Sequence, residues 1–348
     1  MKQFNFVILT NETEGDEHLW ELACKQNSQI SYRIIDLTKN TWLTDLQSAP
    51  FDYLLAKPGG LTSPFKQLYD ERVFILSEEL NYKIFPTPKE IFIYENKRFF
   101  SFWLKANNIP HPKTDVYYSL EEAQAHIDRS DKIIVAKTNI GASGSGVKIL
   151  KSKKEKQEYI NSVFLRKGAP QRSGPNLEKG GLLKRGFHYI LHPRDIKKKL
   201  IVYKTIKLNP QKGFVIFQEY VPHDFEWRIV RIGDSFFAHK KLKLGEKASG
   251  SLQKRYENPP LSILYFVKEI TDKHGFYSQA VDIFETPEGK YLVNEMQCIF
   301  GQSDAYQMKV DGEIGRYIYK NESWVFEAGD FAKNACYNLR LDFVINQL

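Results

Sequence analysis

The sequence predicts an α/β protein built from more than one domain. Its 348 residues exceed what a single hydrophobic core usually organises. Over about the first 90 residues, short apolar runs alternate with helical stretches, which is typical of a parallel sheet covered by helices. From about residue 183 onward, apolar runs follow one another with turns between them, which indicates a part dominated by strands.

The N-terminal elements are delimited by polar and Gly/Pro punctuation. A first strand is expected at residues 4–10, FNFVILT, and a helix follows around 17–26. Two further apolar runs, at 32–37 and 51–57, are bounded by polar residues or by Gly and Pro. Open α/β sheets place ligand-binding loops at the carboxyl ends of their strands, so the ends of the first and third runs are candidate ligand loops.

The rest of the chain continues this alternation before the strands take over. Residues 86–114 are helical at their centre, and Ser119 opens another helix with acids in its first turn. The strand at 131–139 leads directly into the glycine-rich stretch IGASGSGVKIL. The tail after residue 315 predicts a hairpin and a packing helix. Further strands are expected at 214–221, 226–233, 235–242, 280–286 and 291–297.

Charge is unevenly distributed along this basic chain, whose formal net charge is +8. Residues 151–213 hold 17 Lys and Arg against 4 Asp and Glu. Such a concentration attracts anionic ligands, for example nucleotides or phosphorylated or carboxylated substrates. A solvated lysine-rich face without a specific partner explains the run equally well. No recognised nucleic-acid-binding module accompanies it, so binding to nucleic acid is disfavoured.

Cysteine use and hydropathy bear on the type of protein. The 3 cysteines form no CxxC pair, which argues against a disulfide framework and against a structural zinc site. The N-terminal apolar run is too short for a signal peptide. No apolar stretch approaches the roughly 20 residues that cross a bilayer. We therefore expect a cytoplasmic enzyme without a membrane span.

A pair of strands joined by a turn, AVDIFETPEGKYLVNEMQ, carries the first chemical signal. A hairpin centred on the TPEG turn brings Asp282 close to Glu295, with Gln297 on the same side as Glu295. Carboxylate and amide oxygens amid apolar residues suit Mg²⁺ or Mn²⁺ carrying phosphate oxygens. Alone the pattern is weak, since such acids more often face solvent.

Two other segments favour nucleotide binding. In the glycine-rich segment around Ser143 and Gly144, backbone N–H groups can approach phosphate oxygens, although a plain hairpin turn has the same composition. Farther along, an apolar strand delivers Gln218–Val221 to its end, and Glu226 and Arg228 share one face of the next strand. Backbone groups there could read an adenine edge and Glu226 could accept from ribose hydroxyls. A surface Glu–Arg pair is the alternative.

In this order, the features resemble the ATP-grasp superfamily, which includes D-alanine–D-alanine ligase, glutathione synthetase and ribosomal S6 modification-type glutamate ligases. The resemblance runs over nearly the whole chain and implies an N-terminal domain over 1–90, a central lobe over 91–205 and a C-terminal lobe over 206–348. It implies roles for residues at matching positions. The nucleotide-binding set is Lys97, Lys137, Ser143, Gly144, Gln218, Glu219, Tyr220, Val221 and Glu226. The catalytic pair is Arg228 and Lys240, with Lys241 as the alternate for Lys240, and the metal ligands are Asp282, Glu295 and Gln297.

One residue departs from the pattern of the superfamily. The last metal ligand is usually Asn, and here it is Gln297, which keeps the carbonyl oxygen but is one methylene longer. The resemblance also marks Ser249, Ser251 and Arg255 as candidate substrate contacts, although a surface loop explains them equally well. The acceptor pocket is expected from the N-terminal domain and from variable loops at 57–62, 166–182 and 247–256.

The function that the resemblance implies is an ATP- and Mg²⁺-dependent carboxylate–amine ligase, which forms an amide through an acyl phosphate. Its partners are ATP, a small-molecule, peptide or saccharide carboxylate, and an amine, and a homodimer is left open. An ATP-grasp kinase acting on an anionic acceptor is one alternative. A non-catalytic nucleotide-binding regulator is another.

Overall fold

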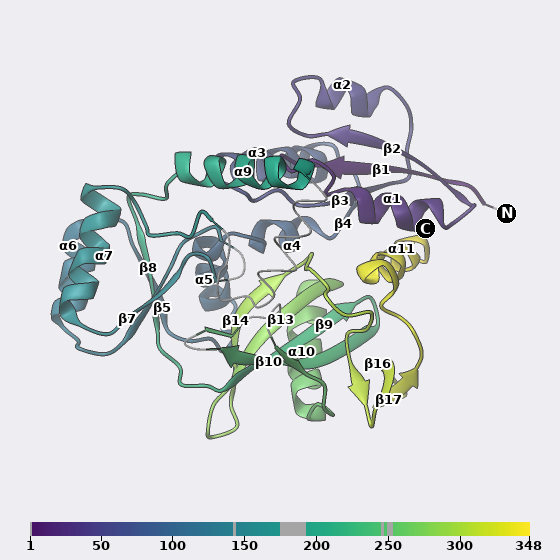
Figure 1. Ribbon diagram of the computed structural model, residues 1–348. Coiled ribbons are helices and arrows are strands. Elements are labelled where there is room, and N and C mark those ends of the chain that lie inside the picture. Colours follow the sequence, from purple (N-terminus) through teal and green to yellow (C-terminus); the bar gives the residue numbers. More distant parts are fainter. Residues whose placement is uncertain (1, 142–143, 175–192, 245–246, 249–252) are drawn as a thin grey trace.

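Three sheets organise the molecule in the computed structural model, which describes residues 2–141, 144–174, 193–244, 247–248 and 253–348 (Figure 1). The first sheet is parallel, the second is antiparallel, and the third is antiparallel and has nine strands. In the described part of the chain, no helix combines the length and the apolar character needed to cross a membrane.

The first sheet has the strand order β2-β1-β3-β4 and contains the N-terminal apolar runs. Its strands are β1 (Phe4–Thr10), β2 (Ile30–Asp36), β3 (Tyr53–Ala56) and β4 (Ile84–Phe85). Its helices are α1 (His18–Lys25), α2 (Trp42–Gln47) and α3 (Ser63–Phe74), which a π-helical turn at Ile75–Glu79 extends. The core beneath them includes Trp20, which packs edge-on against Phe85 and Tyr337.

Tyr337 belongs to the C-terminal helix α11 (Tyr337–Ile345), which returns to pack on this first core (Figure 1). A 3₁₀ turn at Lys333–Cys336 precedes it. The chain therefore closes on its own N-terminal part, and the expected packing helix of the tail is confirmed.

Two helices connect the first sheet to the second. Helix α4 (Pro88–Ile93) begins with Pro88 at its first position and with a capping box, in which Thr87 and Glu90 bond each other's backbone N–H. Helix α5 (Lys97–Ala106) follows, and the Asn96 side chain accepts from the N–H of Phe99 at its start. Lys97 thus stands at the first turn of a helix that enters the space between the sheets.

The second sheet has the strand order β5-β8-β6-β7. Its strands are β5 (Thr114–Tyr117), β6 (Ile134–Lys137), β7 (Val147–Leu150) and β8 (Val215–Glu219), and its helices are α6 (Leu120–Asp128) and α7 (Lys153–Leu165). Helix α9 (Pro193–Leu208) precedes β8 in the chain and lies beside α3 in Figure 1. Strand β8 pairs with both β5 and β6 and so lies inside this sheet.

The third sheet follows the path β14-β13-β9-β10-β16-β15. Its strands are β9 (Phe225–Ile232), β10 (Ser235–Leu244), β11 (Lys247–Ala248), β12 (Lys254–Arg255), β13 (Ser278–Glu285), β14 (Tyr291–Gln297), β15 (Lys309–Val310), β16 (Glu313–Lys320) and β17 (Ser323–Ala328). Helix α10 (Leu261–His274) packs beneath it and ends at Gly275, whose φ of 66° suits glycine.

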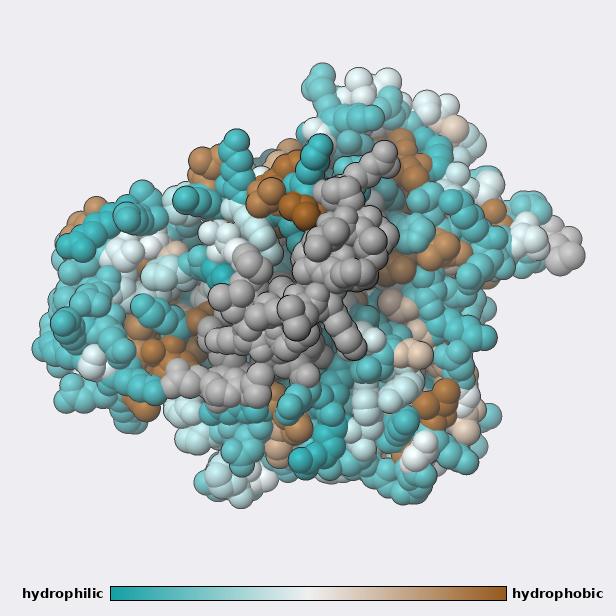
Figure 2. Space-filling model, in the orientation of Figure 1, coloured by the Kyte–Doolittle hydropathy of each residue, from teal (hydrophilic) through white to brown (hydrophobic). Residues whose placement is uncertain are grey.

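Most of the expected elements are confirmed, including the hairpin at β13 and β14 and the strand after the glycine-rich stretch. The expectation that strands take over from residue 183 is wrong for α9 and α10. Both segments mix lysines with apolar residues that pack at helical spacing. On the face drawn in Figure 2, hydrophilic residues predominate and hydrophobic ones form small separate groups.

Candidate functional site

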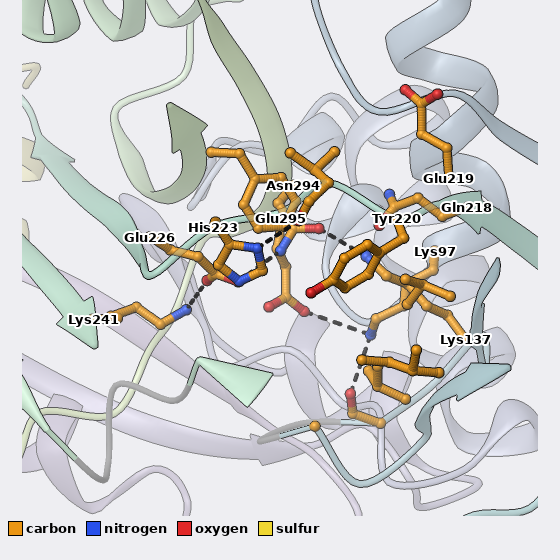
Figure 3. A pocket seen from close by; sticks show the side chains of 17 residues that line it. Lys97, Lys137, Gln218, Glu219, Tyr220, His223, Glu226, Lys241, Asn294 and Glu295 are labelled. Atoms are coloured by element: carbon orange, nitrogen blue, oxygen red, sulfur yellow. Dashed lines mark hydrogen bonds and ion pairs between the residues drawn. The ribbon is translucent and has the colours of Figure 1, made fainter. Parts of the chain in front are cut away.

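A cavity of about 110 Å³ opens where the second and third sheets face each other. Val135, Val147 and Ile149 of the second sheet and Phe284 of β13 give it apolar walls. The ring centroids of His223 and Phe284 lie 4.5 Å apart. The polar part of the lining includes Lys97, Lys137, Gln218, Glu219, Tyr220, Glu226, Lys241, Asn294 and Glu295 (Figure 3). Flat apolar walls beside a dense group of charges suit a ligand with an aromatic ring and an anionic tail.

A chain of alternating charges forms the floor behind this cavity. Lys241 donates to Glu226 Oε2 and to Asp282 Oδ2, both at 2.6 Å. Arg228 donates from Nε to Asp282 Oδ1 at 2.8 Å and from Nη2 to Oδ2 at 2.9 Å. Cross-strand pairing explains this contact, because Asp282 lies directly opposite Arg228 on β9.

Burial and charge act in opposite directions on these groups. Burial disfavours the charged form of Asp282, but Arg228 and Lys241 outweigh it and hold the pKa of that carboxyl well below its usual range. Burial also works against the Arg228 guanidinium, yet Asp282 raises its pKa. All of these groups are therefore charged at neutral pH, in a layer that keeps Arg228 and Lys241 fixed.

A β-bulge in β14 brings two consecutive residues to the cavity. Asp282 pairs with Glu295 whereas Ile283 pairs with Val293, which leaves Asn294 as the extra residue. Consecutive side chains in a regular strand point to opposite faces, but here Asn294 and Glu295 both line the cavity. The hairpin expected around the TPEG turn is confirmed, and so is the expectation that it brings Asp282 close to Glu295.

Two lysines from the central part of the chain reach across to this bulge. Lys137 Nζ donates to Asn294 Oδ1 at 2.8 Å, and Lys97 Nζ lies 3.5 Å from Glu295 Oε1 (Figure 3). Lys97 also donates to the carbonyl oxygen of Gly141 at 3.1 Å, at the base of the glycine-rich stretch. Lys97 of helix α5 and Lys137 of the second sheet thus meet residues of the third sheet in a single cavity.

The two lysines differ in protonation. Burial lowers the pKa of Lys137 to about 8, with the neighbouring Lys97 and Lys241 acting in the same direction and Glu295 and Glu226 against it. Burial also opposes the charge on Lys97, but Glu95 and Glu295 raise its pKa. Lys97 is therefore a permanent cation, whereas Lys137 loses its proton at mildly alkaline pH.

The segment Gln218–Val221 lies at the edge of the cavity, where β8 ends. Gln218 is buried and donates to Thr114 Oγ1 at 3.1 Å. The Glu219 N–H donates to the carbonyl oxygen of Lys113, and its carboxylate points away and accepts from the Lys113 N–H (Figure 3). The backbone N–H of Glu219 therefore already donates a hydrogen bond within the protein. The next two residues, Tyr220 and Val221, also line the cavity.

Lys240, the expected catalytic lysine, is not brought to the cavity. Its ammonium forms an ion pair with Glu257 and lies 4.0 Å and 4.7 Å from the ring centroids of Phe225 and Trp227. Adjacent residues of β10 face opposite sides, and the alternate, Lys241, faces the cavity. The candidate substrate residue Arg255 lies in β12, opposite Lys240 of β10, and is exposed.

Three candidates, Ser143, Ser249 and Ser251, lie outside the described residues. Gly144, the other candidate in the glycine-rich stretch, lines the cavity. The stretch joins β6 and β7, which pair as a hairpin, and Gly141 also lines the cavity.

The donor set around Glu295 suits a hard divalent cation. Glu295 faces the cavity with 29% of its side chain exposed, directly opposite the fully buried Asp282. Gln297 lies two residues farther along the same strand, opposite Ala280. Among the described residues, no group of three or more His, Cys, Asp or Glu side chains could hold a metal. Mg²⁺ commonly takes only one or two carboxylates, with phosphate oxygens and water completing its shell, so these residues fit it.

A second and larger cavity, of about 660 Å³, adjoins the first at Gly141. Its floor comes from the loops after β1 and β3, where Glu12 Oε1 accepts from the N–H groups of Gly60 and Leu61 at 3.0 Å and 2.6 Å. Helix α9 lines another side through a stripe at helical spacing: Lys199, Val202, Tyr203 and Ile206. The loops at 57–62 and 166–182, expected to form an acceptor pocket, both contribute described residues to this lining.

Sequence reasoning missed two residues of the site. Asn294 was missed because strict alternation along β14 puts it on the face opposite Glu295, and the sequence VNEMQ does not predict a bulge. Glu95 escaped because it lies between two helices. Its carboxylate accepts from the Gly141 N–H at 2.8 Å and lies 3.8 Å from Lys97, so it links the two cavities.

Comparison with known proteins gives a fold. No family model and no curated protein matches the sequence. The D-alanine–D-alanine ligase of Bacillus anthracis superposes with a TM-score of 0.55 at 13% identity, covering 99% of this chain and 96% of that one. A RimK-domain ATP-grasp protein of Sphaerobacter thermophilus gives 0.51 at 15% identity, covering 84% and 90%. A peptide-associated (RiPP) ATP-grasp ligase of Chryseobacterium gregarium, in complex with ADP and a leader and core peptide, gives 0.50 at 12% identity, covering 86% and 90%.

Proposed function

The chain has the ATP-grasp fold, and we propose that it is an ATP-dependent carboxylate–amine ligase that forms an amide through an acyl phosphate. The observation that carries the proposal is the convergence of Lys97, Lys137 and Lys241 on one cavity with two acids, beside apolar walls. The residues come from both sheets, as a nucleotide held between two lobes requires. The solved structures of this fold that bear the name ligase support the reaction class.

Each group has a proposed task in holding ATP. The apolar walls around Val135 and Phe284 take the adenine, and Glu226 accepts from the ribose hydroxyls. Lys97 and Lys137 neutralise the phosphates. Arg228 and Lys241, held by Asp282, stand where negative charge grows during transfer of the γ-phosphoryl group.

Two steps follow, and the protein contributes position and charge to both. A carboxylate oxygen of the substrate attacks the γ-phosphorus, and the bond to the bridging β-oxygen breaks, which releases ADP. The nitrogen of the amine then attacks the acyl carbon, phosphate leaves, and the nitrogen loses a proton. Closure of the glycine-rich stretch would exclude water, which otherwise hydrolyses the acyl phosphate.

We also propose that Glu295, Asp282 and Gln297 hold Mg²⁺. The bound ion would neutralise charge on the phosphate oxygens. Their hard oxygen donors and the exposure of Glu295 to the cavity support this set. Asp282 would keep its contacts with Arg228 and Lys241 as well. The same carboxylate would then contact the metal ion and both of these side chains.

The second cavity is our candidate for the acceptor. It meets the nucleotide cavity at Gly141, and Glu95 connects its lining to Lys97. Its charged lining residues include both acids, such as Glu12 and Asp16, and bases, such as Lys57 and Arg172. An ammonium and a carboxylate both find complementary charge there, which favours a ligase over a kinase.

Isotope transfer tests the proposal. The protein is incubated with ATP, Mg²⁺ and N-acetylated amino acids whose carboxylates carry ¹⁸O, with and without added amines. We expect ADP and phosphate to appear only when an amine is present, with one ¹⁸O in each phosphate released, because the attacking oxygen stays on phosphorus. A stable phosphorylated acceptor without released phosphate would establish a kinase instead. Tight ATP binding without any turnover would establish a nucleotide-binding regulator.

A further inference from the structure

The bulge residue Asn294 bridges the two sheets through opposite ends of one amide. Its Oδ1 accepts from Lys137 Nζ at 2.8 Å, and its Nδ2 donates to Glu226 Oε1 at 3.2 Å. Lys137 ends β6 of the second sheet, whereas Glu226 lies in β9 of the third. The amide therefore stands between a cation and a carboxylate that reach the cavity from different sheets (Figure 3).

The chemistry of the two partners fixes the orientation of this amide. An ammonium can only donate, so Lys137 must meet the carbonyl oxygen. An ionised carboxylate can only accept, so Glu226 must meet the NH₂ group. A flipped amide would lose both bonds, so Asn294 is oriented by its partners on both sides.

The two partners of Asn294, Glu226 and Lys137, are held in place and can still bind a ligand. Glu226 Oε2 is held by Lys241, so both oxygens of this buried carboxylate are anchored by the protein. Lys137 keeps donors beyond the one that it gives to Asn294. Both groups line the cavity, and the amide sets how far apart they stand.

We propose that Asn294 is a positioning residue for the nucleotide, which holds Lys137 and Glu226 at a fixed separation so that one molecule can engage both. This inference rests on the proposed function, in which Lys137 serves the phosphates and Glu226 the ribose. The β-bulge brings Glu295 to the same face, so that Asn294 and Glu295 reach the cavity side by side.

A neutral amide suits this position better than the residues of similar size. Aspartate at 294 would stand beside Glu226 and Glu295, adding a third negative charge, and it would neutralise Lys137 before the phosphates arrive. Leucine would fill the space but leave the buried Glu226 oxygen and the Lys137 ammonium without these hydrogen bonds. Asparagine satisfies both partners and leaves the charge of Lys137 for the ligand.

A double-mutant cycle read by ADP binding separates positioning from a general structural role. ADP affinity is measured by calorimetry for the wild type, N294A, K137M and the double variant. In a second cycle through E226Q, the cost of N294A should likewise be smaller than in the wild type. Loss of hydrogen bonds to charged groups should weaken ADP binding by about 10- to 100-fold in N294A. In the K137M background the same change should cost less than about threefold, because the partner that it positions is gone.

Adenosine provides an independent readout. It lacks phosphates, so N294A should weaken adenosine binding less than ADP binding. The matched control is N258A, which removes an exposed amide bonded to Asp311 and should leave ADP affinity unchanged. Circular dichroism and thermal unfolding of each variant confirm that the fold persists.

Every outcome decides the inference. Equal costs of N294A in the wild-type and K137M backgrounds would overturn it and assign Asn294 a purely structural role in the bulge. ADP affinity unchanged in N294A would overturn it as well. If the wild type binds ADP but shows no turnover, the proposed ligase activity is refuted and the double-mutant cycle can still be measured. If the wild type does not bind ADP, the proposed function and this inference are both refuted.

Discussion

Arg228 and Asp282 are joined side by side, with two parallel hydrogen bonds of 2.8 Å and 2.9 Å between guanidinium and carboxylate. The side chain of Asp282 is 1% exposed, and it also accepts from Lys241. A buried carboxylate that holds two cations is structural as well as chemical, because removing it takes the two parallel bonds from the buried Arg228 and leaves Lys241 with Glu226 alone.

Asp282→Ala should therefore lower the free energy of unfolding by roughly 3–5 kcal/mol and abolish turnover. Denaturant unfolding followed by circular dichroism measures the first effect. The matched control is Glu327→Ala, which removes the half-exposed partner of Arg316 and should cost less than about 1 kcal/mol. Equal costs for the two variants would contradict the buried layer described above.

Glu295→Ala tests the proposed metal site with less effect on the fold. Glu295 is 29% exposed on its side chain and contacts Lys97 at 3.5 Å, so its loss should change stability little. Turnover should fall by about a hundredfold or more, because a carboxylate for the divalent cation is gone. Initial rates at several Mg²⁺ concentrations measure this, and full ATP turnover in the variant would refute the assignment.

Lys241 and Lys240 should behave differently although they are neighbours. Lys241→Met removes the cation between Glu226 and Asp282 and should reduce turnover by at least about a hundredfold. Lys240→Met removes an ion pair and ring contacts on the other face of β10 and should keep turnover within about threefold. Steady-state rates of the two variants decide which lysine serves the reaction.

The choice between these lysines was available from the sequence. Strands β9 and β10 join through the two residues Gly233 and Asp234, and counting back from that turn sets Lys241 opposite Glu226. Residues directly opposite share a face, so the turn predicts the pairing that the structure has. The resemblance to the family favoured Lys240 with Lys241 as the alternate, whereas the strand register selects Lys241.

The bulge at Asn294 could not be predicted by counting residues from a turn. The pairs next to the turn, from Glu285–Tyr291 to Ile283–Val293, would continue to Asp282–Asn294 in a regular hairpin. The extra residue in β14 puts Glu295 opposite Asp282 instead. A bulge depends on packing across three strands, and local sequence does not encode it. Helix α9 was missed although Val202, Tyr203 and Ile206 are at helical spacing, because lysines interrupt its apolar residues along the sequence.

Nucleotide affinity should depend on pH through Lys137. Burial lowers the pKa of this lysine to about 8, so its charge is present below pH 8 and is lost as the pH rises through that value. ADP affinity should therefore fall between about pH 7 and pH 9. Lys137→Arg keeps its charge throughout and should flatten this part of the profile, which calorimetry at constant ionic strength measures. An unchanged profile in that variant would assign the dependence to another group.

Glu90 should make stability depend on pH in the opposite sense from an ordinary surface acid. Burial raises the pKa of this carboxyl to about 7, against hydrogen bonds from Ser278, Thr87 and Gln279 that favour its charged form. In the unfolded chain it titrates near 4.5, so between these values the unfolded state releases the proton that the folded state keeps. The contribution of Glu90 is full below about pH 4.5 and is lost as the pH rises to about 7, a change of up to about 3 kcal/mol.

Unfolding free energies of the wild type and Glu90→Gln, measured from pH 4.5 to 7.5, test this directly. The variant should be less stable overall, because an amide cannot accept all the bonds that the carboxylate accepts, and its stability should lack the decline attributed to Glu90. Glu155→Gln is the matched control, since Glu155 occupies the same capping-box position in α7 but is exposed. If the wild type and Glu90→Gln differ by the same amount at every pH, Glu90 does not titrate in this range and its hydrogen bonds outweigh its burial.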